Sequence, residues 1–241
     1  MSLPVGTKLL LHLNTSSLDS SAAPHASTDG AGVSFQSSVK QLGAGAAAFD
    51  GTANAWISFA DSADWGLVDG DLLLEGFFRW STRPSSSLQV LIGQWDEQAG
   101  GSKSFRLYLN HDGVNFSLKL QTSTNGTTLA NTYESDVLTI LANTFYHMRA
   151  CRISGVLYFF LNGVAKGSMA MTDTLANATG TLFIGANING ATKNRNLNGY
   201  ADEVLFVKGN GVSAAGFTPP ASEYVDVTNV GKMSTRRRRR F

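Results

Sequence analysis

Residues 144–167 (TFYHMRACRISGVLYFFLNGVAKG) constrain the fold most, because they combine apolar alternation with clear turn residues. Side chains alternate between two faces along a strand. Ser154–Gly155 and Asn162–Gly163 have the chemistry of tight turns. The segment therefore predicts the central hairpin of a β-sandwich, followed by a short return strand at 164–167. Its two faces would carry Phe145, His147, Arg149 and Cys151 on one side and Tyr146, Met148, Ala150 and Arg152 on the other.

The composition predicts one all-β domain. The chain has 241 residues, 43% of them hydrophobic and 15% charged, which suffices for one large core. Its 25 glycines, with many Ser, Thr and Asn, suit short strands joined by tight turns, and long helical periodicity is absent. We expect about a dozen strands, at 8–13, 33–35, 43–51, 56–59, 72–80, 90–94, 105–110, 114–122, 127–135, 181–186 and 199–207 in addition to the central hairpin.

The sequence also predicts one strand pairing and two long loops. We expect residues 90–94 to pair with residues 72–80, and residues 14–32 to form a long loop pinned by Leu18. Residues 187–198 are rich in asparagine and predict a second loop. Both loops belong to the rim of the predicted sandwich.

Cysteine use and hydropathy describe the expected compartment. The one cysteine, Cys151, lies in an apolar strand and predicts a buried, inert thiol rather than a nucleophile. The first residues lack the basic and apolar regions of a secretory signal, and no apolar run approaches the roughly 20 residues of a membrane span. We expect a protein made in a cytoplasm without a signal peptide and without a membrane span.

The charge is divided between an acidic body and a basic tail. Five of the 19 basic residues stand at 236–240, so residues 1–235 carry 14 basic and 18 acidic side chains. A domain that reads nucleic acid would spread basic and aromatic residues over a folded face, so we expect no sequence-specific nucleic acid partner. A docking arm onto carboxylates of a neighbouring protein fits better, and its predicted residues are Arg236, Arg237, Arg238, Arg239, Arg240 and Phe241.

The order of several short motifs resembles the laminin-G-like, concanavalin-A-like jelly-roll domains. These motifs are LLLHL at 9–13, GAAAFDG at 45–51, DSADW at 61–65, GDLLLE at 70–75, FLNG at 160–163, LFIG at 182–185 and GYADEV at 199–204. The ending, VKG at 207–209 followed by FTPPASEY at 217–224, is similar to a subgroup found in structural proteins of tailed bacteriophages. The resemblance implies a two-sheet antiparallel jelly-roll sandwich over residues 8–226, an N-terminal extension at 1–7, and a linker and basic arm at 227–241.

The resemblance also implies a function. We expect a virion structural protein, displayed on a phage capsid or tail, anchored through its basic arm to other virion proteins in a homo-oligomer or symmetric assembly. Host-surface carbohydrate is the expected second partner. The alternative function is a dedicated carbohydrate-binding adhesin of a tail fibre. A third, less favoured function is that of a glycan hydrolase.

The spacing of the carboxylates and histidines along the chain does not support a catalytic site. Some relatives of this architecture are glycoside hydrolases, and Asp69, Asp71 and Glu75 would share one face of a strand. A retaining pair needs carboxyl groups about 5 Å apart, whereas residues four apart in a strand are separated by roughly 13 Å. The four histidines lack metal-ligand spacing as well. We therefore expect a protein that is not an enzyme and requires no cofactor.

A structural calcium ion is implied by the resemblance at Asp50, Asp202 and Glu203, because carboxylates are the oxygen ligands that calcium prefers. The alternative is that these residues cap turns and carry surface charge.

Sugar binding needs an exposed aromatic plane beside amide or carboxylate groups in a concave site. Residues 94–98 (QWDEQ) and the asparagine-rich loop offer both kinds of group. Trp95 would supply the aromatic plane; the alternative is that it packs as an ordinary loop residue. The predicted carbohydrate-binding residues are Trp95, Asp96, Asn187, Asn189, Asn194 and Arg195.

Overall fold

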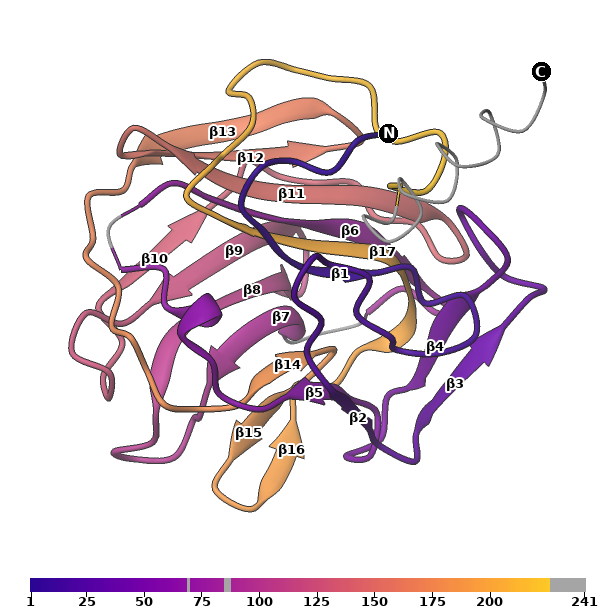
Figure 1. Ribbon diagram of the computed structural model, residues 1–241, viewed down its shortest axis with the longest axis horizontal. Coiled ribbons are helices and arrows are strands. Elements are labelled where there is room, and N and C mark those ends of the chain that lie inside the picture. The colour runs from indigo at the N-terminus through magenta and orange to yellow at the C-terminus, as the bar shows by residue number, and fades with distance from the viewer. Residues whose placement is uncertain (69, 85–87, 226–241) are drawn as a thin grey trace, which may run out of the picture.

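The computed structural model describes residues 1–68, 70–84 and 88–225, which form two antiparallel sheets packed face to face (Figure 1). This confirms the predicted all-β, two-sheet antiparallel sandwich. In the described residues the only helix is a 3-10 turn, η1 (Ala63–Trp65). The basic arm lies outside the described residues.

The first sheet contains eight strands, in the order β13-β12-β11-β6-β17-β4-β3, with β1 also paired to β17. Its centre is the predicted hairpin, in which β11 lies between β12 and β6. The bounds are β1 Thr7–Leu11, β3 Val33–Gln36, β4 Ala46–Asp50, β6 Leu72–Trp80, β11 Phe145–Ile153, β12 Val156–Leu161, β13 Val164–Ala170 and β17 Asn198–Lys208.

The second sheet contains seven strands, in the order β10-β9-β8-β7-β14-β5-β2. A separate two-stranded hairpin, β15 and β16, lies below β14 and β5 in the view of Figure 1. The bounds are β2 Ser27–Asp29, β5 Ile57–Phe59, β7 Gln89–Trp95, β8 Lys103–His111, β9 Phe116–Thr122, β10 Asn131–Glu134, β14 Leu182–Ile184, β15 Asn187–Asn189 and β16 Thr192–Asn194.

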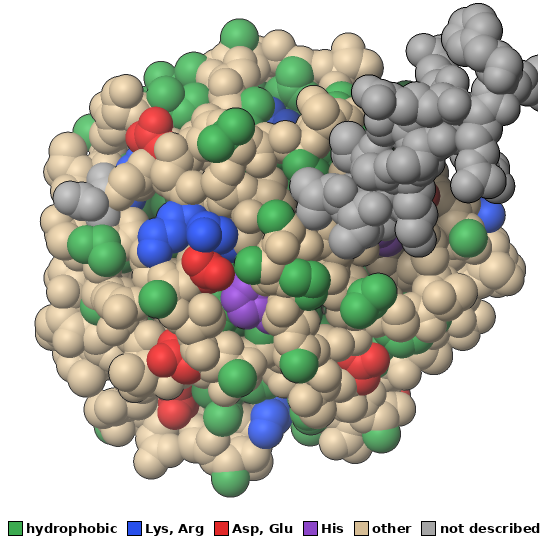
Figure 2. All heavy atoms as spheres, viewed as in Figure 1, with side chains coloured by type: hydrophobic (Ala, Val, Ile, Leu, Met, Phe, Trp, Pro, Cys, Tyr) green, Lys and Arg blue, Asp and Glu red, His purple; other side chains and the backbone are tan. Residues whose placement is uncertain are grey.

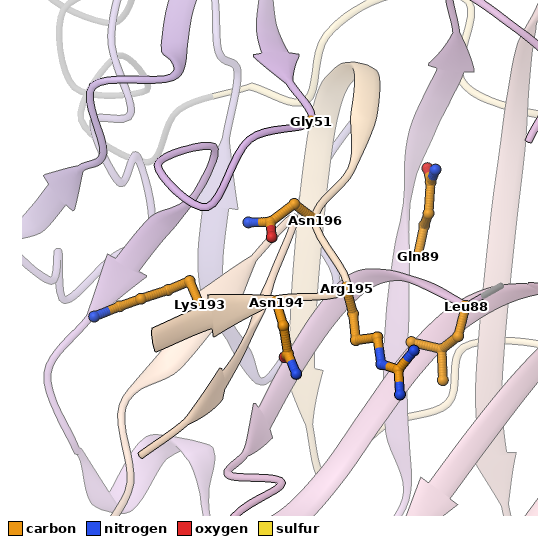
Figure 3. Close-up of a pocket in the computed structure, with 7 residues that line it drawn as sticks. All are labelled: Gly51, Leu88, Gln89, Lys193, Asn194, Arg195 and Asn196. Atoms are coloured by element: carbon orange, nitrogen blue, oxygen red, sulfur yellow. The ribbon is translucent and has the colours of Figure 1, made fainter. Parts of the chain in front are cut away.

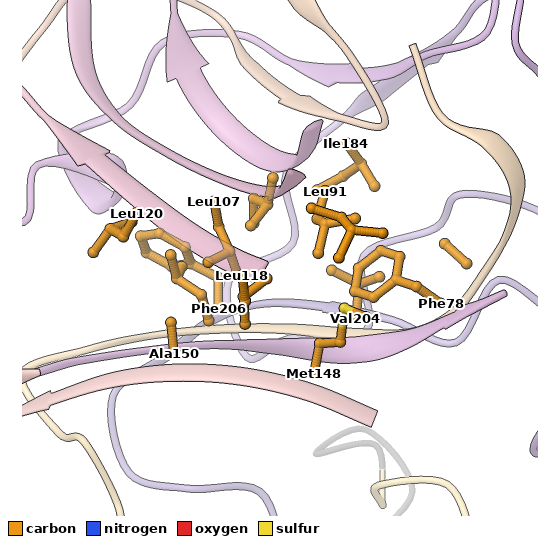
Figure 4. Close-up of a cluster of buried hydrophobic side chains, with 14 of the residues drawn as sticks. Phe78, Leu91, Leu107, Leu118, Leu120, Met148, Ala150, Ile184, Val204 and Phe206 are labelled. Carbon is orange, nitrogen blue, oxygen red and sulfur yellow. The ribbon is translucent and has the colours of Figure 1, made fainter. Parts of the chain in front are cut away.

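The main core fills the space between the two sheets (Figure 4). Each fully buried Leu or Phe contributes roughly 1.5–3 kcal/mol relative to exposure. The expected alternation of the central hairpin is confirmed, because Met148 and Ala150 of β11 point into this core. They meet Phe78, Val204 and Phe206 of the same sheet and Leu91, Leu107, Leu118, Leu120 and Ile184 of the other sheet.

The outer face of the first sheet is covered as well. Cys151, a buried free thiol as predicted, joins a second apolar cluster with Phe160 and Tyr224. The Phe217 amide donates to the carbonyl of Gly163, which ties the segment after β17 across this face. Both faces of β11 are therefore shielded from water, which explains its nearly continuous burial.

A buried ionic group lies under this covering segment. The Arg149 Nε donates to Glu75 at 2.5 Å, and the Tyr224 hydroxyl donates to the same carboxylate at 2.6 Å. The Arg149 guanidinium also stacks on Phe217, 3.5 Å from the ring centroid. These partners satisfy a carboxylate that is only 2% exposed, so the cluster locks the C-terminal segment onto the sheet.

His147 is buried in the same group, between Phe77 and Phe217. Desolvation by burial lowers the pKa of His147 from 6.5 to about 4; the charge of Glu75 opposes this shift and that of Arg149 adds to it. The imidazole is thus neutral at pH 7.

Four details differ from the sequence predictions. Residues 14–32 are not wholly a loop, because they contain β2, which pairs with β5. Strand β7 does not pair with β6 but with β8 and β14 in the opposite sheet. Residues 187–198 are not a plain loop, because they contain the β15–β16 hairpin. Leu18 is 67% exposed and pins nothing; the buried Asp19 holds the long loop by accepting hydrogen bonds from three backbone amides.

Charged side chains are sparse and mixed in sign on the face shown in Figure 2. Among the described residues, no helix is long and apolar enough to cross a membrane.

The depressed pKa of His147 predicts a pH-dependent stability. Its unfolded form takes up a proton as the pH falls below about 6.5, whereas the folded form stays neutral until about pH 4. The parent should therefore lose on the order of 3 kcal/mol from this group across that window. His147→Gln should show a correspondingly flatter profile in urea unfolding measured from pH 7.5 to 4. Parallel profiles for the two proteins would contradict this account.

Candidate functional site

The β15–β16 hairpin gathers polar side chains beyond the end of β7. Asn187 pairs with Asn194 in its register, and Gly190 supplies the left-handed conformation of its turn, at φ 61°. The hairpin is attached to β7, because the Asp96 carboxylate accepts from the Gly190 amide at 3.0 Å and the Glu97 amide donates to Ile188 at 2.8 Å.

Glu97 organises the side chains around this junction. Its carboxylate accepts from Arg106 at 2.5 Å and from Asn194 at 2.7 Å. Asn187 and Arg195 donate to it at 3.3 and 3.2 Å. One carboxylate thereby joins β8, both strands of the hairpin and the residue that follows them.

The same contacts keep Glu97 ionised. Burial alone would raise the pKa of Glu97, but hydrogen bonds from Arg106 and Asn194, with the charges of Arg106 and Arg195, lower it overall. The carboxylate is thus a fixed anchor for the surrounding cations and amides.

A cavity of about 410 Å³ opens beside the hairpin (Figure 3). Asn194 and Asn196 extend from the hairpin side, and Gln89 comes from the start of β7. Arg195 has a φ of 55°, and its carbonyl accepts from the Val90 amide, which fixes the chain at the edge of the cavity. The described residues that line the cavity are Gly51, Leu88, Gln89, Lys193, Asn194, Arg195 and Asn196.

A tryptophan stands next to this cavity, but it is Trp56. The Lys193 ammonium lies 5.3 Å from the centroid of its ring. The ring is half-buried and packs edge-on against Phe183. Trp56 and Lys193 therefore combine an aromatic plane with a cation at one side of the site.

Trp95 is not the exposed aromatic plane that we predicted. Its side chain is 3% exposed, because it packs beneath the Arg106 guanidinium, whose central carbon is 5.0 Å from the ring centroid. The Trp95 ring is thus not an exposed platform, although it borders a cavity of about 190 Å³ together with Asp96.

The other predicted sugar-binding residues divide into two groups. Asn194 and Arg195 line the cavity, whereas Asn189 is exposed on the hairpin and Asp96 supports its turn. Asn187 is 1% exposed and acts behind the cavity, through Glu97. The contribution of each to binding stays a prediction.

Sequence reasoning missed Gln89, Asn196 and Trp56 as neighbours of this site. Gln89 is placed by contacts that are distant in sequence, since its side-chain oxygen accepts from the Trp80 indole at 2.6 Å. Trp56 carried a signal that was available, an aromatic residue following a polar turn at 52–54. Nothing local indicated that this turn lies beside the asparagine-rich segment.

The residues predicted for calcium do not converge. Asp50 pairs with Asn198, roughly 13 Å along β17 from Asp202, and its carboxylate caps Thr52. Asp202 is fully buried; one carboxylate oxygen accepts from the amides of residues 41 and 42, and the other has no hydrogen-bond partner among the residues that the structure describes. Desolvation raises the pKa of Asp202 to about 7 against these hydrogen bonds, and the charges of Glu203 and Glu223 add to the rise.

Glu203 instead belongs to another cluster. Its carboxylate contacts the His12 Nδ1 at 2.8 Å and accepts from the Tyr224 amide at 2.6 Å. His12, Glu203 and Glu223 form the one described group of three potential metal ligands within 4.8 Å of one another. Two carboxylates suit calcium, whereas the imidazole nitrogen suits zinc. The calcium prediction is therefore carried by Glu203 alone among the three predicted residues.

The carboxylates considered for hydrolysis were Asp69, which lies outside the described residues, Asp71 and Glu75. Glu75 is engaged by Arg149 and Tyr224, and Asp71 accepts from the Ser154 amide at 2.8 Å. The docking residues Arg236, Arg237, Arg238, Arg239, Arg240 and Phe241 lie outside the described residues.

Comparison with known proteins places the fold. Residues 50–209 match the laminin G-like family described as the concanavalin A-like lectin/glucanases superfamily. No curated protein matches the chain.

Solved structures share the architecture at low sequence identity. The binding domain of Paraclostridial Mosquitocidal Protein 1 has a TM-score of 0.65 and 13% identity, covering 86% of this chain and 50% of that chain. The binding domain of botulinum neurotoxin serotype G has a TM-score of 0.62 and 14% identity, with 86% and 48% covered. The chain thus spans about half the length of these two toxin domains.

A third structure is matched over nearly its whole length. Domain 4 of an extracellular GH43 arabinanase from Geobacillus stearothermophilus, in complex with arabinotriose, has a TM-score of 0.58 and 16% identity. The match covers 86% of this chain and 94% of that chain.

If the protein binds calcium, its melting temperature should rise with added calcium and fall with a chelator, because a ligand that binds only the folded state stabilises that state. Glu203→Gln should lose this response. The exposed Asp136→Asn, after β10, serves as the matched control and should keep it. A melting temperature that is indifferent to calcium and chelator would contradict the prediction.

Proposed function

Because this chain belongs to the concanavalin A-like lectin/glucanase superfamily, we propose that it is a carbohydrate-binding domain whose ligand occupies the cavity beside the β15–β16 hairpin. The proposed role is binding without catalysis.

The observation that carries this proposal is the lining of the cavity. Three amide side chains, Gln89, Asn194 and Asn196, border one open concavity of about 410 Å³. Amides offer both donors and acceptors, as sugar hydroxyls require. The Asn194 side chain is oriented by its bond to Glu97, so it is held in place before a ligand arrives.

Two further observations support it. The Asn196 side chain is also oriented before a ligand arrives, because it donates to the Ala55 carbonyl at 3.2 Å. In addition, the arabinanase domain that shares this fold over 94% of its length is described in complex with arabinotriose, an oligosaccharide.

Glycan-array screening of the purified chain tests the proposal. The parent should bind at least one class of oligosaccharide, and Asn194→Ala and Asn196→Ala should each weaken that binding about five- to tenfold, since each removes a hydrogen bond of about 1 kcal/mol.

The matched control is Asn115→Ala, which removes an exposed amide from the β8–β9 turn. It should bind like the parent, and all variants should melt as cooperative folded proteins. The absence of any glycan bound by the parent would refute the proposal.

At a finer level, we propose that the domain is displayed on the virion of a tailed phage and binds host-surface carbohydrate there. Support comes from the sequence: the FTPPASEY ending resembles phage structural proteins, and the basic run at 236–240 suits docking onto acidic surfaces. A tail-fibre adhesin would use the same cavity.

Deletion of residues 232–241 tests the anchoring role. The truncated protein should retain its melting temperature and glycan binding but should fail to enter particles when it replaces the parent during assembly. Replacing the five arginines by lysines retains charge and should give partial entry, because lysine lacks the bidentate geometry of arginine. Normal entry of the truncated protein would contradict the anchoring role.

A further inference from the structure

We propose that the glycan bound in this cavity is an acidic polysaccharide, contacted through anionic groups on at least two of its sugar residues. This inference rests on the proposed function and names the chemical class of its ligand.

The charges that line the cavity are of one sign. Its described lining contains two cations, Lys193 and Arg195, with three amides and no carboxylate. A neutral sugar would leave Lys193 without a counter-charge, whereas a carboxylate or sulfate would pair with Lys193 and with the free nitrogens of Arg195.

Two carboxylates beside the cavity, Glu97 and Asp50, accept hydrogen bonds from other groups. Glu97 accepts from Arg106 at 2.5 Å and from Asn194 at 2.7 Å, so it is shared among several donors. One carboxylate oxygen of Asp50, at the neighbouring turn, accepts from the amide and hydroxyl of Thr52. Neither Glu97 nor Asp50 forms an ion pair with Lys193 in the described structure.

Lys193 and Arg195 both have N–H donors that are not used in hydrogen bonds among the described residues. Only the Nε of Arg195 contacts Glu97, at 3.2 Å, and among the described residues its two terminal nitrogens have no acceptor. The Arg195 side chain is 42% exposed. Lys193 contacts the Trp56 ring and likewise has no carboxylate partner in the described structure. These donors can reach a ligand without breaking an existing pair.

The directions of the two side chains suit an elongated ligand. Residues two apart in a strand share a face, but Arg195 follows the end of β16 in a left-handed conformation that redirects its side chain. Figure 3 accordingly shows Lys193 and Arg195 extending to opposite sides, with Asn196 between them. A chain with repeated acidic residues can meet both side chains.

The test compares acidic oligosaccharides with neutral counterparts of the same backbone. Oligogalacturonates and α2,8-linked oligosialates of two, four and eight residues are measured against their methyl esters, and dextran sulfate against dextran. Calorimetry at two salt concentrations should show tighter binding of acidic forms, affinity that rises from two to eight residues, and weakening by salt. The dextran pair distinguishes sulfate from carboxylate.

Charge-removing variants locate the effect. Lys193→Met and Arg195→Gln should each weaken binding of the eight-residue acidic probe about two- to fivefold, in line with exposed ion pairs. The matched control, Lys166→Met, removes a lysine from β13 in the other sheet and should change nothing. The neutral counterparts should be indifferent to all three substitutions.

The outcomes separate this inference from the proposed function. Equal affinity for acidic and neutral forms would overturn the acidic ligand and leave carbohydrate binding intact. Acidic binding that survives both Lys193→Met and Arg195→Gln would overturn the assignment to this cavity. A parent that binds no acidic probe, no neutral probe and no glycan on the array would overturn both proposals together.

Discussion

Burial of both faces of β11 is the constraint on which the rest of this structure depends. One face supplies Met148 and Ala150 to the core between the sheets, and the other presents Arg149 to Glu75 beneath the C-terminal segment. A buried carboxylate destabilises a fold unless it is fully partnered, so this segment must close over the ion pair for the sheet to be stable. The centre of the molecule is thereby occupied by structural groups, and the proposed binding site lies at its rim.

At the rim, Glu97 has the role that Glu75 has at the centre. It joins β8 to the β15–β16 hairpin through Arg106 and Asn194, which fixes the amides and cations beside the cavity. The same contacts neutralise its charge and leave the cavity lining positive. One carboxylate thus both builds the site and sets the sign of the ligand that it favours.

Alternation and turn residues predicted the sandwich and the central hairpin, because those signals are local. Pairing across sheets is not local: β7 contacts β8 and β14, and no residue in 90–94 specifies that choice. The burial of Trp95 also depends on a contact that is not local, because Arg106, which covers its ring, comes from the next strand. Asn194 and Arg195 were predictable from composition, whereas Gln89 and Trp56 reach the site only through tertiary packing.

Amide-resolved NMR titration tests the central claim, that glycan binds beside the β15–β16 hairpin, most directly. Addition of an oligosaccharide that the chain binds should shift the amide signals of Gly51, Gln89 and residues 193–196, with smaller changes at Trp56. Signals of the covered outer face, such as Arg149 and Tyr224, should stay in place. Shifts concentrated on that outer face, or spread over the second sheet away from the hairpin, would contradict the account.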